Sequence, residues 1–149
     1  MAVHFDAEYL PALAGLVVGA LIGYLLATST RRASTWDARV TLPLVLAAGA
    51  AHLALIPTVE AQRQLLFGLY FAAMTGTFVL GLLRVGIWKL GALVFPAGSI
   101  LAYFYFALTA HEADFIGLAV KVVEAAVIVA AVRSVLARSE AGARRPYAA

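Results

Sequence analysis

The stretch YLPALAGLVVGALIGYLLAT, residues 9–28, contains no charged side chain over its whole length. A helix needs about 20 predominantly apolar residues to cross the hydrocarbon core of a bilayer, so this stretch predicts a transmembrane helix. Four later stretches are also predominantly apolar, and the predicted spans are therefore residues 9–28, 40–57, 65–83, 87–109 and 115–136. We expect an all-α, polytopic transmembrane helix bundle that forms one domain over residues 1–149.

The composition supports a membrane protein over a water-soluble one. Hydrophobic residues make up 64% of the chain and charged residues only 13%, where soluble domains have about 25% charged residues. The net charge of +3 does not indicate nucleic-acid binding, because the basic residues are divided among short loops, the predicted spans and the C-terminal tail. The chain has no cysteine, which excludes disulfides, thiolate metal sites and cysteine nucleophiles.

The distribution of lysine and arginine predicts the orientation of the spans. Cytoplasmic loops of membrane proteins carry the excess of these residues. With the N-terminus outside and the C-terminus in the cytoplasm, the cytoplasmic side receives Arg31, Arg32, Arg39, Arg84, Lys89, Arg133, Arg138, Arg144 and Arg145. We expect residues 137–149 to form a basic cytoplasmic tail that contacts anionic lipid. The first eight residues contain no lysine or arginine, so we expect no cleaved signal peptide, and we place the protein in the plasma membrane.

Small residues recur every four positions on two predicted helices. The first carries Gly15, Gly19 and Gly23, and the third carries Gly68, Ala72 and Gly76. Such spacing places small residues on one helix face, where another helix backbone can approach closely. The partner helix can belong to the same chain or to another subunit, and the sequence leaves both alternatives open.

Two opposite charges lie inside the fifth predicted span, at Lys121 and Glu124. Ionisable side chains within a bilayer are costly unless they are paired or hydrated, and they often mark functional sites. The two residues share a helix face because they are three positions apart. One interpretation is a salt bridge that only neutralises itself, and the other is a proton or ion relay or a ligand site. Residues at comparable depth extend the candidate intramembrane polar cluster to His52, Tyr70, Tyr103, Tyr105, Lys121 and Glu124.

Imidazole and carboxylate groups also gather on the predicted outer side. A copper or zinc site there is a hypothesis with poor specificity, because acidic outer loops follow from the topology alone. Its candidate ligands are His4, Asp6, His52, His111 and Glu112. The sequence requires no cofactor, although one histidine could ligate a haem held by a partner.

The run HLALIPTVEAQRQLLFGLYF, residues 52–71, followed by KVVEAAVIV, residues 121–129, resembles small multi-pass membrane proteins of actinobacterial type. The resemblance covers about half of the chain. It is carried by His52, Pro57, Glu60, Gly68 and Phe71. The group has no established activity, so the resemblance implies a membrane protein and no particular chemistry.

The sequence is consistent with three functions. The favoured hypothesis is a non-catalytic small subunit of a larger membrane complex, such as a respiratory or oxidase-type assembly, because no catalytic motif is present. The second is a small oligomeric transporter of ions, protons or a solute that uses Lys121 and Glu124. The third is an extracytoplasmic metal-binding or redox accessory protein. The expected partners are the bilayer and either other membrane subunits or further copies of the chain.

Overall fold

The structure is a computed structural model that describes residues 10–32, 35–110 and 115–143. Its long helices are α1 (Leu10–Ala27), α2 (Leu42–Leu55), α3 (Ala61–Leu82), α4 (Trp88–Ala110) and α5 (Phe115–Ala143). With the short helical turns that extend α1 and α2, five segments are long and apolar enough to cross a membrane. The predicted all-α bundle is therefore confirmed for the described residues, and its five long helical segments have the length and composition of membrane spans.

Helix ends differ from the predicted span ends because hydropathy locates the membrane and not the helix termini. A π-helical turn, Thr28–Arg32, continues α1, and a second one, Asp37–Thr41, precedes α2. The polar residues at the start of α3 are already helical, so α3 begins at Ala61, just after Glu60 with its extended backbone. Helix α5 continues to Ala143, past the predicted end of its span, through a sequence rich in good helix formers.

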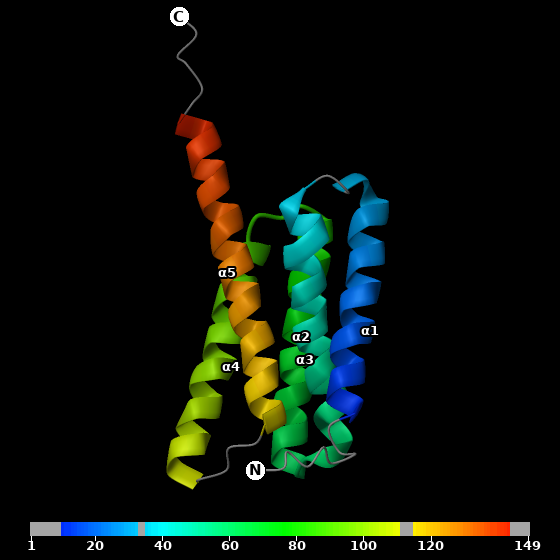
Figure 1. The fold of residues 1–149 in the computed structure, drawn as a ribbon, viewed down its shortest axis with the longest axis vertical. Coiled ribbons are helices and arrows are strands. Elements are labelled where there is room, and N and C mark those ends of the chain that lie inside the picture. The colour runs from blue at the N-terminus through cyan, green and yellow to red at the C-terminus, as the bar shows by residue number, and fades with distance from the viewer. Residues whose placement is uncertain (1–9, 33–34, 111–114, 144–149) are drawn as a thin grey trace, which may run out of the picture.

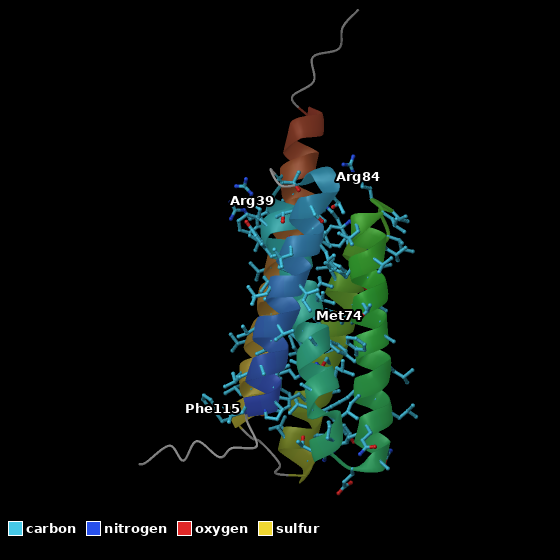
Figure 2. The ribbon with its side chains drawn as sticks, turned by 90° about the vertical axis from the view of Figure 1, so that its right-hand side faces the viewer. Arg39, Met74, Arg84 and Phe115 are labelled. Atoms are coloured by element: carbon cyan, nitrogen blue, oxygen red, sulfur yellow. The ribbon has the colours of Figure 1, made fainter. Side chains whose placement is uncertain are left out.

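Consecutive helices run in opposite directions, and α2 occupies the centre of the bundle (Figure 1). Helix α2 packs against α1, α3 and α5, whereas α4 packs against α3 and α5. Arg39 and Arg84 lie at one end of the bundle, and Phe115 lies at the other (Figure 2). We call the end with Arg39 and Arg84 the basic end, and the end with Phe115 and the α2–α3 connection the opposite end.

The glycine stripe of α1 packs against α2 of the same chain. A methyl group built on Gly19 would lie 2.7 Å from the Cβ of Ala50 and 2.9 Å from the Cα of Ala47. The corresponding methyl on Gly15 would lie 2.6 Å from the carbonyl oxygen of Ala50. The backbones of α1 and α2 therefore approach closely along this face, which leaves it unavailable to another subunit.

The small residues of α3 behave differently. A methyl group built on Gly76 would meet nothing within 4 Å, and one on Gly68 would meet only the Cδ1 of Ile56, at 4.0 Å. Within the described part of the chain, the Gly68–Gly76 face therefore makes no close backbone contact, and it faces outward near Gly76.

The turn between α3 and α4 is a Schellman motif. The backbone N–H of Val85 donates to the carbonyl of Leu80, and that of Arg84 donates to the carbonyl of Gly81. This pattern needs a left-handed residue just after the helix, and Arg84 occupies that position with φ of 62°. The motif lets α4 reverse direction within a few residues.

The apolar core lies from the middle of the bundle towards the basic end. Its largest buried side chains include Leu42, Met74, Phe78 and Trp88, and Val127 contributes from α5. Asp37, Thr41, Thr77 and Ser134 are buried in the same half of the bundle as this core. The buried ionisable side chains His52, Lys121 and Glu124 lie towards the opposite end.

Candidate functional site

Four helices each turn a polar or aromatic face to the interior near the opposite end. Residues three or four positions apart share a helix face, and each helix contributes one such pair. The pairs are Ala48 and His52 on α2, Phe67 and Tyr70 on α3, Ser99 and Tyr103 on α4, and Lys121 and Glu124 on α5.

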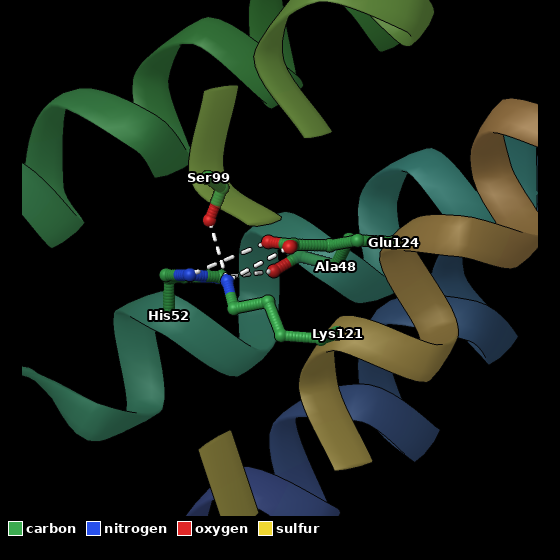
Figure 3. A network of polar contacts seen from close by, with 5 residues as sticks. All are labelled: Ala48, His52, Ser99, Lys121 and Glu124. Carbon is green, nitrogen blue, oxygen red and sulfur yellow. Dashed lines mark hydrogen bonds and ion pairs between the residues drawn. The ribbon is translucent and has the colours of Figure 1, made fainter. Parts of the chain in front are cut away.

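Lys121 and Glu124 form a buried salt bridge (Figure 3). The Nζ of Lys121 lies 2.8 Å from the Oε2 of Glu124, and Glu124 is completely buried. Lys121 also donates a hydrogen bond of 2.5 Å to the Oγ of Ser99 on α4. Its ammonium group lies 5.8 Å from the centre of the Tyr103 ring. One cation thus holds α4 and α5 together through a carboxylate and a hydroxyl group.

His52 joins this cluster from α2 (Figure 3). Its Nδ1 lies 2.9 Å from the carbonyl oxygen of Ala48, one turn earlier in the same helix. Its Nε2 lies 3.5 Å from the Oε1 of Glu124. Two aromatic rings of α3 enclose the imidazole, with Tyr70 centred 4.1 Å and Phe67 centred 5.0 Å from it.

Two buried polar atoms of the cluster have no hydrogen-bond partner within the described residues. They are the Oε1 of Glu124 and the hydroxyl of Tyr70. Tyr70 and Glu124 are nevertheless near enough to interact electrostatically. Buried polar atoms without partners are uncommon, and they often mark a binding or proton-transfer function.

The structure brings together five of the six residues proposed for the polar cluster and separates the sixth. Tyr105 has an exposed fraction of 63% and lies outside the cluster. Two residues along an α-helix correspond to about 200° of rotation, so Tyr105 points away when Tyr103 points in. The sequence-based prediction that Tyr105 belongs to the cluster is therefore wrong.

A pocket of about 690 Å³ leads to this cluster. Residues of the α2–α3 connection line it at the opposite end of the bundle, and residues of the cluster line it deeper inside. The lining comprises His52, Leu55, Thr58, Val59, Glu60, Gln62, Arg63, Leu66, Phe67, Tyr70, Ser99, Ala102, Tyr103, Phe106, Ile116, Gly117, Val120 and Lys121.

The wall of the pocket carries more positive than negative charge. Lys121 and Arg63 line the pocket, whereas Glu60 is the acidic side chain among the lining residues. Glu124 is fully buried behind Lys121 and does not line the pocket. With His52 neutral, the wall carries one more positive than negative charge, and the rest of it is mainly apolar and aromatic.

The sequence did not identify Ser99 or Arg63 as site residues. Ser99 lies four positions before Tyr103 on α4, so the helical period could have placed it on the same face. Arg63 lies in the first turn of α3, where its guanidinium is 5.9 Å from the centre of the Phe106 ring. Only the structure brings that part of α3 close to α4.

The metal-site hypothesis receives no support from the described residues. Of its candidate ligands, His4, Asp6, His111 and Glu112 lie outside them. Within residues 10–32, 35–110 and 115–143, no group of three histidine or carboxylate side chains could hold a metal ion. His52 instead faces Glu124 and Tyr70.

Comparison with protein-family models, curated proteins and solved structures gives no match to this chain. The function is therefore inferred from the pocket and the polar cluster.

Proposed function

We propose that the protein is a small membrane transporter that binds a small organic anion in the pocket, beside Lys121. The observation that carries this proposal is the pocket itself, which reaches a buried lysine–glutamate pair inside the membrane-spanning bundle. The transport hypothesis now has more support than the subunit hypothesis, because α2 already occupies the glycine face of α1.

The size and lining of the pocket suit a small molecule. Ligand pockets have volumes of roughly 300–1,000 Å³ and are mostly apolar, with a few polar groups that orient the ligand. The volume of about 690 Å³ lies in this range. Phe67, Tyr70, Tyr103 and Phe106 supply aromatic surface, and Ser99 and Lys121 supply hydrogen-bond donors. These groups favour an anion with an apolar body, such as an aromatic carboxylate or sulfonate.

An anion can bind Lys121 without separating it from Glu124. Two of the N–H donors of the ammonium group bond to Glu124 and Ser99. The hydroxyl of Ser99 is a neutral acceptor, and an anionic oxygen in its place makes a shorter, charge-assisted hydrogen bond. Such exchange would also loosen the link between α4 and α5 and so connect ligand binding to helix movement.

The distribution of basic residues predicts the side of the membrane to which the pocket opens. If the basic end is cytoplasmic, as the lysine and arginine bias of short loops favours, the pocket opens to the outside. The proposed protein is then an uptake system of the plasma membrane, with its N-terminus outside and its C-terminus inside. Five helices are few for a monomeric carrier, so we expect it to act as an oligomer.

The proposal is tested by the binding of benzenesulfonate to the purified protein in detergent, measured by calorimetry. This probe is an aromatic ion that stays charged, and neutral benzenesulfonamide is its matched control. We expect benzenesulfonate to bind and benzenesulfonamide to bind about 10- to 100-fold more weakly, the equivalent of one hydrogen bond to a charged group. Proteoliposomes that contain the protein should take up the labelled anion.

Two variants complete this test. Lys121→Met combined with Glu124→Gln removes both charges without leaving one of them unpaired, and it should abolish the preference for the anion. Tyr105→Phe, on the outward face of α4, should bind like the wild type. Equal binding of both probes, or no difference between the double variant and the wild type, would reject the anion site.

A subunit of a membrane complex is the second candidate function, and one observation favours it. Only 11% of the residues in the membrane-spanning window of α4 are buried inside the bundle. Leu101, Tyr105 and Leu108 are among the exposed side chains of this helix. This face can contact lipid, a second copy or a different subunit. Native mass spectrometry after gentle extraction distinguishes them, since foreign chains of fixed stoichiometry would support the subunit function.

A further inference from the structure

We infer that each anion bound in the pocket is accompanied by one proton taken up between His52 and Glu124, so that transport is an anion–proton symport. This inference rests on the proposed function and adds the coupling ion. It is based on the charges of the cluster and on the geometry of the His52–Glu124 contact.

Without a ligand, the charges of the cluster cancel. Lys121 and Glu124 lie 2.8 Å apart and are both buried, and a neutral His52 adds no charge. Net charge in a low-dielectric interior is costly, whereas a close ion pair offsets much of that cost. The empty cluster is therefore electrically balanced.

The contacts of His52 define where a proton can be added. A carbonyl oxygen can only accept a hydrogen bond, so the Nδ1 of His52, 2.9 Å from the carbonyl of Ala48, carries a proton. In the neutral ring, Nε2 then has a lone pair and no proton. This nitrogen lies 3.5 Å from the Oε1 of Glu124, an oxygen with no hydrogen-bond donor in the described residues. Two acceptors therefore face each other in the buried cluster.

An anion beside Lys121 makes the site negative by one charge, and one added proton restores neutrality. A proton from the aqueous phase of the pocket, on whose wall His52 lies, adds to the lone pair of Nε2. The resulting N–H donates to the Oε1 of Glu124, which gains its missing partner.

The other titratable groups around this pair cannot take up that proton. Tyr70 on α3 and Tyr103 on α4 are neutral when protonated and can only lose a proton. Lys121 on α5 already carries its proton in the salt bridge. His52 and Glu124 are therefore the pair that can accept a proton when an anion enters.

The coupling is tested by adding benzenesulfonate to the purified protein in a weakly buffered solution near neutral pH and recording proton uptake. Benzenesulfonate does not itself bind a proton at this pH, so any uptake belongs to the protein. We expect about one proton for each anion bound, which is the stoichiometry that charge balance requires. In His52→Gln the number of protons taken up per bound anion should fall to zero, whereas Tyr105→Phe, on the outward face of α4, should retain the uptake.

The results separate the two proposals. Binding without proton uptake, or equal uptake by His52→Gln and the wild type, overturns the symport inference and leaves the anion site intact. Absence of binding by the wild type overturns both proposals. If His52→Gln does not fold, ¹⁵N NMR of the wild-type histidine rings decides. The signal of His52 should change from the neutral ring protonated at Nδ1 to a ring with both nitrogens protonated, and an unchanged signal contradicts the inference.

Discussion

Replacement of Glu124 by leucine is expected to destabilise the protein by about 3–5 kcal/mol, the usual cost of leaving one partner of a buried ion pair without the other. Glu124 is fully buried and lies 2.8 Å from the ammonium group of Lys121. The leucine side chain fits the apolar surroundings but leaves the cation of Lys121 with a neutral hydroxyl group as its main partner. Thermal unfolding of the variant in detergent measures the loss.

The matched control removes both charges. Lys121→Met combined with Glu124→Leu should have a stability close to that of the wild type, because replacing a whole buried pair with apolar residues is often neutral. A double variant as unstable as Glu124→Leu alone would contradict this explanation. The pair would then stabilise the helices by its shape and hydrogen bonds, and a functional reason for its presence would no longer be needed.

Gly19→Ala should destabilise the bundle by about 1–3 kcal/mol, the typical cost of overpacking a closely packed interface. The new methyl group would lie 2.7 Å from the Cβ of Ala50 and 2.9 Å from the Cα of Ala47. The second of these atoms belongs to the backbone of α2, so the two helices must separate to make room. Stability against thermal unfolding in detergent measures the effect.

Gly76→Ala is the control for the effect of alanine on the helix itself. Its methyl group meets nothing within 4 Å, and alanine is the better helix former by about 1 kcal/mol, so its stability should be unchanged or slightly higher. If Gly19→Ala left the stability equally unchanged, α1 and α2 would not be in close contact at this position. The glycine stripe of α1 would then be available for another subunit.

The sequence was sufficient to predict the five helices, because their long apolar stretches depend only on the thickness of the bilayer. It could not define the helix ends. The polar residues after Ala61 continue a helix that hydropathy alone starts later, and the π-helical turns Thr28–Arg32 and Asp37–Thr41 have no hydropathy signal. Which glycine face is used inside the bundle also depends on how the helices rotate, and a repeat of small residues does not encode this rotation.

The candidate site was predictable in part. Lys121 and Glu124 stand out because charges within a span are rare, and their spacing on one helix predicts the salt bridge that the structure contains. Residues on other helices were harder to assign. Tyr103 and Tyr105 have similar depths but opposite directions, and a serine such as Ser99 is unremarkable until a lysine from another helix lies 2.5 Å away. Long-range contacts of this kind depend on helix rotation and tilt.

Uptake of an anion from outside requires a pocket that opens to the outside and reaches Ser99 and Lys121. The chain has no cysteine, so Ser99→Cys introduces a single thiol on the pocket wall. Leu101→Cys, whose parent side chain is 71% exposed on the outside of α4, provides a control that faces lipid. A charged, membrane-impermeant thiol reagent is added to intact cells, because thiols react as thiolates, which form in water and not in hydrocarbon.

We predict that the thiol at position 99 reacts from the outside, that benzenesulfonate slows the reaction, and that the thiol at position 101 remains unmodified. Reaction at position 99 only after the cells are permeabilised would place the pocket on the cytoplasmic side. No reaction under either condition would mean that water does not reach Lys121, and either result would contradict the proposed uptake of an anion from outside.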